Sequence, residues 1–309
     1  MSSESLHGKR VLVTGASGFI GSHLCRRLCQ IGAQVHALSR TEHADGDARL
    51  HWWRGDVAEL DAVRGIVIAA RPDVVFHLAS HVVGAREREQ VMPTFRANLM
   101  SSVNVMLAAS EAGCRRVVLT GSLEEPEDGE AEAVPCSPYA AAKWASSGYA
   151  RMFRALYQLD VVTLRVFMVY GPGQGDLKKL IPYVTLALLR GESPKLSSGQ
   201  RQVDWIYVDD VVEGFVAAAE ANDGIGQTVD IGSGALVPIR AVVERLGRLI
   251  NPDIKLQFGA LPERPLERVR VADTVRTQKV LGWQPSVPLE KGLKQTVDWY
   301  GRWLKEHAQ

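Results

Sequence analysis

The sequence predicts an α/β protein built on a doubly wound parallel sheet, followed by a smaller α/β lobe. Short runs rich in Val and Leu alternate with longer helical patterns in the first half of the chain. This alternation is typical of parallel sheets with helices on both faces. A glycine-rich turn joins the first strand to the first helix. After residues 171–174 the alternation weakens and Pro and Gly become denser, which indicates the second lobe.

The elements of the first lobe follow one another in a regular order. We expect strands over 10–14, 34–38, 73–78, 116–120 and 161–166, and helices from Gly18, before Asp73, and over 98–112 and 138–158. Residues 205–231 are expected to return and complete the sheet. The predicted first domain therefore spans 8–167 plus 204–232, and the second spans 168–203 plus 233–309.

Composition excludes several classes of protein. The 309 residues hold 36 Lys and Arg against 35 Asp and Glu, so the charge balance favours neither nucleic acid nor an anionic membrane as partner. The four cysteines form no Cys-x-x-Cys pair, so we expect neither a disulfide framework nor a metal site. Residues 1–8 are polar, and no apolar stretch reaches the ~18 residues of a membrane span. We expect a cytoplasmic protein with a small-molecule partner.

The turn after the first strand has the composition of a phosphate-binding turn. Small residues let the backbone approach a diphosphate, and the helix N-terminus presents N–H groups and a partial positive charge to it. An ordinary tight turn is the alternative. The residues expected to bind a dinucleotide here are Gly15, Ser17, Gly18, Phe19, Ile20 and Gly21.

Four motifs together identify a resemblance that runs over essentially the whole chain. They are the Gly-x-x-Gly-x-x-Gly turn, Gly55-Asp56-Val57 after the third strand, His77-Leu78-Ala79-Ser80 after the fourth, and Tyr139-x-x-x-Lys143. The chain resembles the extended short-chain dehydrogenase/reductase family, also described as NAD-dependent epimerases and dehydratases, whose sheet is a Rossmann sheet.

The resemblance implies further binding residues and partners. Asp56 and Val57 are expected at the adenine, and residues 78–80 (Leu78, Ala79 and Ser80) along the cofactor, with Asn98 in a supporting role. His77 and His81 flank this path, although a packed or hydrogen-bonded histidine is the simpler interpretation. The implied substrate is a nucleotide-diphosphate sugar, and helices 98–112 and 138–158 are expected to pair in a homodimer.

The end of the second strand bears on the choice of cofactor. Folds that select NAD usually place a carboxylate there, on the ribose hydroxyls. Here Ser39 takes the expected acidic position, and Arg40 offers a fork of donors suited to a 2′-phosphate. This favours NADP, while a solvated Arg40 would leave NAD in use.

Tyr139 and Lys143 are i and i+4 on a predicted helix, so they share one face. Moving a tyrosine pKa from ~10 to ~7 takes about 4 kcal/mol, and an ammonium ~4 Å away at an effective dielectric of ~20 supplies roughly that. We therefore expect Lys143 to lower the pKa of Tyr139. The resemblance implies that Tyr139 exchanges a proton with the sugar, Ser122 steadies its oxygen, and hydride passes between nicotinamide and a sugar carbon.

Departures from the family motifs bear on the reaction. Glu124 stands where the 4,6-dehydratases of the family keep a catalytic Glu, but Leu123 replaces their acidic Asp and carries no proton. A resemblance to reductases of nucleotide-linked 4-keto-6-deoxyhexoses is carried by four segments, residues 39–40, 121–125, 264–265 and 282–285. Residues 165–172 instead resemble 4-epimerases of nucleotide-linked glucuronic acid. The sequence analysis favours the reductase, with 4-epimerase, dehydratase, decarboxylase and a non-enzymatic NADP-binding sensor as alternatives.

Cations of the second lobe are candidates for binding the diphosphate of the sugar nucleotide. We expect Arg201, Arg264 and Lys179 in this role, although each has a surface or salt-bridged alternative. Family members usually carry Arg at the position of Val203 and Asn at that of Met168. Neither the nucleotide base nor the sugar is therefore assigned from the sequence.

Overall fold

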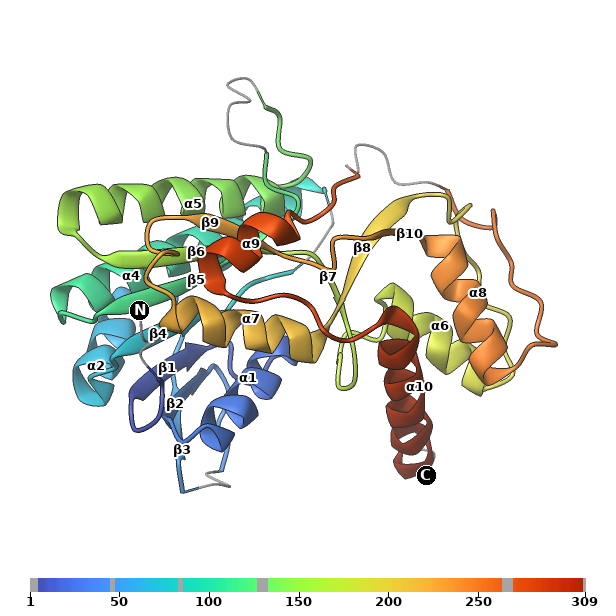
Figure 1. The fold of residues 1–309 in the computed structure, drawn as a ribbon, viewed down its shortest axis with the longest axis horizontal. Helices are drawn as coiled ribbons and strands as arrows, with labels where there is room; N and C mark the ends of the chain where they lie inside the picture. The colour runs from blue at the N-terminus through green and yellow to red at the C-terminus, as the bar shows by residue number, and fades with distance from the viewer. Residues whose placement is uncertain (1–4, 45–47, 83–85, 127–132, 263–268, 308–309) are drawn as a thin grey trace. The chain divides into compact units, whose positions relative to one another are not determined.

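The computed structural model describes residues 5–44, 48–82, 86–126, 133–262 and 269–307 (Figure 1). The chain divides into two compact units. The first comprises Met1–Val166, Val212–Ile231 and Val275–Trp283. The second comprises Phe167–Val211, Gly232–Thr274 and Gln284–Gln309.

The first unit contains a seven-stranded sheet in the order β3-β2-β1-β4-β5-β6-β9, and every pairing in it is parallel. This confirms the predicted fold class. The strands are β1 (Arg10–Thr14), β2 (Gln34–Ser39), β3 (Leu50–Arg54), β4 (Val74–His77), β5 (Arg116–Ser122), β6 (Asp160–Val166) and β9 (Thr228–Ile231). The chain winds outward in opposite directions from β1 and β4, so the carboxyl ends of these two strands mark the switch point where ligands bind in such sheets.

Helices cover both faces of this sheet. They are α1 (Phe19–Gln30), α2 (Leu60–Ala70), η1 (Arg88–Gln90), α3 (Val91–Thr94), η2 (Phe95–Met100), α4 (Ser101–Glu111), α5 (Pro138–Tyr157), α7 (Val208–Glu220) and α9 (Thr274–Leu281). On one face α4 packs between α2 and α5. The other face carries α1 and α7 (Figure 1). An ion pair joins these two helices, with 2.6 Å between Arg27 Nε and Glu213 Oε1.

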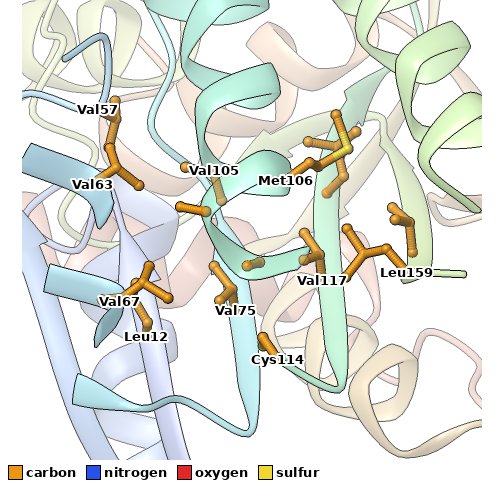
Figure 2. Close-up of a cluster of buried hydrophobic side chains, with 14 of the residues drawn as sticks. Leu12, Val57, Val63, Val67, Val75, Val105, Met106, Cys114, Val117 and Leu159 are labelled. Carbon is orange, nitrogen blue, oxygen red and sulfur yellow. The ribbon is translucent and has the colours of Figure 1, made fainter. Parts of the chain in front are cut away.

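The main core lies between the sheet and helices α2, α4 and α5. In this cluster Val67 of α2 lies on one side of Val75 and Val117 on the other, and Met106 of α4 lies on the side of Val117 (Figure 2). These side chains are almost fully buried. At roughly 1.5–3 kcal/mol for each large apolar side chain, this layer stabilises the sheet on which the site is built.

The helix expected over 98–112 has two parts in the structure. It starts with the wide turns of η2, a π-helix, and continues as α4. The hydroxyl of Ser101 donates to the carbonyl of Ala97, and that of Ser102 donates to the carbonyl of Asn98, each at 2.6 Å. Such side-chain bonds to the preceding turn compete with the helical ladder, and wide turns of this kind often occur at functional sites.

The second unit is built on a small mixed sheet in the order β10-β8-β7. Its elements are β7 (Met168–Tyr170), α6 (Leu180–Leu189), β8 (Gln202–Tyr207), β10 (Leu236–Pro238), α8 (Ile239–Ile250) and α10 (Leu289–Glu306). Buried Asp204 accepts hydrogen bonds from the amides of Ser233, Gly234 and Ala272 at 2.6–3.0 Å. One carboxylate thus fixes two loops of this unit.

The domain boundaries differ from those expected. Residues 204–211 belong to the second unit, because β8 pairs with β7 and β10, whereas β9 joins the large sheet as predicted. Residues 275–283 belong to the first unit, where Thr277 Oγ1 donates to the carbonyl of Asp230 at 2.7 Å. Among the described residues, no helix is both long and apolar enough to cross a bilayer.

Candidate active site

The turn between β1 and α1 forms a cradle of bare backbone. Gly15 has φ +69°, and a Cβ added there would lie 2.7 Å from the amide nitrogen of Ala79. A Cβ on Gly21 would lie 2.1 Å from the carbonyl oxygen of Gly15. Gly18 begins α1 with no side-chain cap, and Phe19 and Ile20 form its first turn. The cradle suits the diphosphate of a dinucleotide, because glycine lets the phosphate approach the helix N-terminus.

The carboxyl end of β4 lies beside this cradle. The amide of Leu78 donates to the carbonyl of Thr14, and that of Ala79 donates to Thr14 Oγ1, both at 3.2 Å. His77 is buried, with Nδ1 2.8 Å from Thr14 Oγ1 and Nε2 3.4 Å from Ser101 Oγ. Burial, together with the charge of Lys143, lowers the pKa of His77 to about 3. His77 is therefore a packed, neutral, hydrogen-bonded histidine.

Hydroxyl groups gather at the carboxyl end of β2. Ser39 is buried, and its Oγ lies 3.2 Å from Ser17 Oγ and 3.1 Å from Thr41 Oγ1. His43 Nε2 lies 3.3 Å from Ser39 Oγ. Arg40 is exposed. This end of the strand carries hydroxyls and a cation where a carboxylate would select NAD.

The other expected cofactor residues line the same edge of the sheet. Asp56 Oδ1 accepts the amide of Ala58 at 2.9 Å, which holds the turn after β3, and Val57 is buried. Asn98 lies in η2, where its Oδ1 accepts from Ser80 Oγ at 3.1 Å and from the amide of His81 at 2.6 Å. Asn98 therefore holds the loop after β4 in position.

Tyr139 and Lys143 sit in the first two turns of α5. Ser137 caps this helix, because its Oγ accepts the amide of Ala140 at 3.1 Å, and Pro138 occupies the first turn. Lys143 is 1% exposed, and its Nζ donates to the carbonyl of Thr120 at 2.7 Å and lies 5.9 Å from the centroid of the Tyr139 ring. Burial lowers the pKa of Lys143 to about 8.

The pKa of Tyr139 is raised, whereas the sequence led us to expect that it would be lowered. Burial raises its pKa, and the charges of Glu124 and Glu125 act in the same direction, while hydrogen bonds with Ser122 and Ser80 lower it. Lys143, which was expected to lower this pKa, does not offset these effects. Loss of hydration around the phenol outweighs the favourable contacts, so Tyr139 is held protonated in this structure.

Glu124 lies next to Ser122, the serine predicted to act in catalysis. Its amide donates to Ser122 Oγ at 3.2 Å, and its Oε2 accepts from Ser137 Oγ at 3.2 Å. Leu123 brings no ionisable group to this turn. The turn after β5 therefore joins Ser122, Glu124 and the start of α5 in one set of hydrogen bonds.

The residues predicted to bind the substrate lie in the second unit. Lys179 precedes α6, and its amide donates to the carbonyl of Asp176 at 3.1 Å. Arg201 precedes β8, and its carbonyl accepts the amide of Ile239 at 3.0 Å. Arg264 lies outside the described residues. Their role in binding stays a prediction.

Residues 11–232 match the model of the family described as the NAD dependent epimerase/dehydratase family. The chain belongs to this family. It is an enzyme of the extended short-chain dehydrogenase/reductase type, as the four motifs indicated. Apart from Arg10 at the start of β1, the match covers the strands of the large sheet, and it includes all the proposed catalytic residues.

Named relatives of this family are similar over nearly their whole length. A UDP-glucose 4-epimerase of Mycolicibacterium smegmatis is 33% identical, over 94% of this chain and 98% of the relative. A dTDP-glucose 4,6-dehydratase of Streptomyces griseus is 30% identical, over 94% and 93%. The solved structure of MoeE5 with UDP-glucuronic acid and NAD is 32% identical, with a TM-score of 0.84 and coverage of 95% and 99%.

These three proteins bear on two expectations. None is named as a reductase of 4-keto-6-deoxyhexoses, the reaction favoured by the sequence analysis, and the epimerase alternative has the better support. The MoeE5 structure contains NAD, and the preference for NADP stays a prediction.

Glu125, beside the candidate site, was not predicted from the sequence. Glu125 is 3% exposed, and its carboxylate bonds to the amide of Ser122 and the hydroxyl of Ser147. A glutamate in a polar turn gives no sign of burial on its own. The available signal was the nearby glycine, Gly121, whose missing side chain leaves room for the Glu125 carboxylate.

Proposed function

We propose that this enzyme is a nucleotide-sugar 4-epimerase that uses a nicotinamide dinucleotide. The arrangement of Ser122, Tyr139 and Lys143 at the carboxyl edge of the sheet, beside a turn with Leu123 in place of an acid, carries the proposal. Epimerisation at C4 needs a group that takes and returns one proton and a hydroxyl that holds the sugar oxygen. It needs no second acid for a leaving hydroxyl.

Each residue has one task in this proposal. Tyr139 exchanges the proton of the C4 hydroxyl, Ser122 hydrogen-bonds the same oxygen, and buried Lys143 supplies positive charge. A bound nicotinamide dinucleotide would supply exchange of hydride with C4 and a positive charge that favours ionisation of the phenol. Hydride that returns to the opposite face of the planar C4 carbonyl inverts this carbon.

The bare backbone of the β1–α1 turn supports binding of the cofactor diphosphate by Gly15, Gly18 and Gly21. We assign the diphosphate of the substrate to Arg201, Lys179 and Arg264. Two similar proteins carry UDP-linked sugars in their names, and we take a UDP-hexose or UDP-uronic acid as the first substrate class to test.

The test starts from purified enzyme with UDP-glucose or UDP-glucuronic acid deuterated at C4, analysed by NMR and mass spectrometry. We expect the C4 epimer at unchanged mass with the deuterium retained, and its formation slowed by about 10²–10⁴-fold in Tyr139→Phe. Loss of water would indicate a dehydratase, and loss of carbon dioxide a decarboxylase. Either product would contradict the proposal.

A reductase of 4-keto-6-deoxyhexoses is the second candidate, and Ser39 with Arg40 favours it. A reductase takes up fresh NADPH in each turnover, so a site for the 2′-phosphate would serve it. With such a keto sugar, consumption of NADPH that weakens in Arg40→Ala but not in Arg26→Ala would favour the reductase. Equal use of NADPH by the wild type and Arg40→Ala would exclude a 2′-phosphate contact by Arg40.

A further inference from the structure

The turn that follows β5 contains a buried carboxylate with no assigned role. Glu125 Oε1 accepts the amide of Ser122 at 2.6 Å, and Oε2 accepts the hydroxyl of Ser147 at 2.7 Å. The amide of Glu125 donates to the carbonyl of Ser122 at 3.1 Å and closes the turn. A carboxylate is rarely buried unless its charge and its oxygens are satisfied.

The space for this carboxylate is provided by Gly121. A Cβ at this glycine would lie 2.6 Å from Glu125 Oε1, so even an alanine would displace the carboxylate. Gly121 has no positive φ, and a turn conformation therefore does not explain the glycine. Burial of the Glu125 carboxylate instead accounts for the glycine, because any side chain at residue 121 would occupy the same space.

Ser122 and Lys143, the proposed catalytic partners of Tyr139, both form hydrogen bonds with residues 120–125. Ser122 is bonded to Glu125 directly. Lys143 lies one helical turn before Ser147 on α5, and its Nζ donates to the carbonyl of Thr120. The negative charge of Glu125 favours the protonated form of Lys143 against the cost of burial.

We infer that Glu125 is a positioning residue, which holds the backbone of Ser122 against α5 and acts as the buried counter-charge of Lys143. This role rests on the proposed function only in so far as Ser122 and Lys143 serve the reaction. Other groups around Lys143 are His77 from β4 and Tyr139 from α5. His77 is neutral above about pH 3, so Glu125 is the group among them that supplies negative charge.

Glu125→Gln tests the electrostatic part with little change of shape. The amide oxygen can accept from Ser122, and the NH2 group can donate to the hydroxyl of Ser147. Without the negative charge, the pKa of Lys143 should fall by about one unit or more, since an opposite charge a few ångströms away has effects of this size. Lysine labelled with ¹³C at Cε, assigned with Lys143→Arg, reports this titration by NMR in the absence of substrate.

Ser147→Ala is the matched control, because it removes a hydrogen bond and keeps the charge. The midpoint of Lys143 should not fall in this variant. Gly121→Ala leaves Glu125 in the sequence but displaces its carboxylate, so it should lower the titration midpoint of Lys143 as Glu125→Gln does. This variant replaces Glu125→Gln in the test if Glu125→Gln does not fold. An unchanged Lys143 midpoint in a folded Glu125→Gln or Gly121→Ala would overturn the inference.

The pH profile of turnover adds a second readout. Loss of the Glu125 charge lowers the pKa of both Tyr139 and Lys143, so both limbs of the kcat profile should move to lower pH. A merely structural role would lower the profile without moving it, which would also overturn the inference. If the lysine midpoint falls but no epimer forms with any sugar nucleotide, the proposed reaction fails while the link between Glu125 and Lys143 stands.

Discussion

In the proposed reaction Tyr139 exchanges the proton, and it does so through its phenol hydroxyl. Tyr139→Phe should lower kcat by about 10²–10⁴-fold, the usual contribution of a general acid-base group. Ser122→Ala should lower kcat by about 10²-fold through loss of a hydrogen bond to the reacting oxygen. Stopped assays of epimer formation measure both effects.

Tyr157→Phe provides the control for this pair, because Tyr157 is an exposed tyrosine at the other end of α5. It should keep wild-type kcat, and all three variants should still bind the cofactor. Wild-type turnover in Tyr139→Phe would remove Tyr139 from the reaction.

His77 makes stability depend on pH. Its pKa is about 3 in the folded chain against 6.5 for an unperturbed histidine, so between these values the unfolded chain holds the extra proton. The free energy of unfolding therefore falls as the pH is lowered from 6.5, by about 2 kcal/mol at pH 5 from this residue. Urea unfolding at pH 7 and pH 5 measures the difference.

His77→Gln should be less stable than wild type at pH 7 but should lose less stability between pH 7 and pH 5. His307→Gln, which changes an exposed histidine after α10, should keep the wild-type difference. The same loss of stability in His77→Gln as in wild type would contradict the assignment of this pH dependence to His77.

At the scale of elements, the β1–α1 turn depends on two glycines for different reasons. Gly15 needs its positive φ and its closeness to Ala79, whereas Gly21 needs room beside the carbonyl of Gly15. Gly15→Ala and Gly21→Ala should each cost more than about 1 kcal/mol of stability and abolish cofactor binding. Calorimetry and titration with NAD and NADP test both effects.

Gly65 of α2 is the matched control. It is an exposed helical glycine with open space around its Cα, so Gly65→Ala should raise the free energy of unfolding by about 0.5–1 kcal/mol. Cofactor binding should stay at its wild-type level. Normal binding by Gly21→Ala would show that the cradle tolerates a side chain and would contradict our account of the turn.

At the scale of the whole molecule, exposed apolar side chains gather on helices that pack against each other. Met92 of α3, Phe95 of η2, and Tyr149 and Leu156 of α5 are 42–67% exposed, and α5 packs against both α3 and η2. Exposed apolar side chains that gather on neighbouring elements mark protein interfaces. We expect a second copy of the chain to cover it in a two-fold dimer.

Leu156→Glu combined with Met92→Glu should convert this dimer into a monomer, because a buried unpaired charge is strongly unfavourable. Light scattering after size exclusion measures the mass. Ile68→Glu, on exposed α2, should leave the mass unchanged. A monomeric wild type, or a dimer that survives the double substitution, would contradict this interface.

Local patterns in the sequence determined much of the fold and of the candidate site. The alternation of strands and helices predicted the parallel sheet, and the spacing of Gly15, Gly18 and Gly21 predicted the phosphate cradle. The i, i+4 spacing of Tyr139 and Lys143 placed both on one helix face. Each of these signals acts over a few residues, because strand, turn and helix geometry are local properties.

Only the tertiary structure decided which distant segments meet. It assigned β8 to the second unit, buried Glu125 against Ser122 and Ser147, and bonded Lys143 to the carbonyl of Thr120. It also reversed the expected direction of the Tyr139 pKa. Sheet partners, burial and desolvation depend on groups far apart in the chain, so no spacing within one segment could predict them.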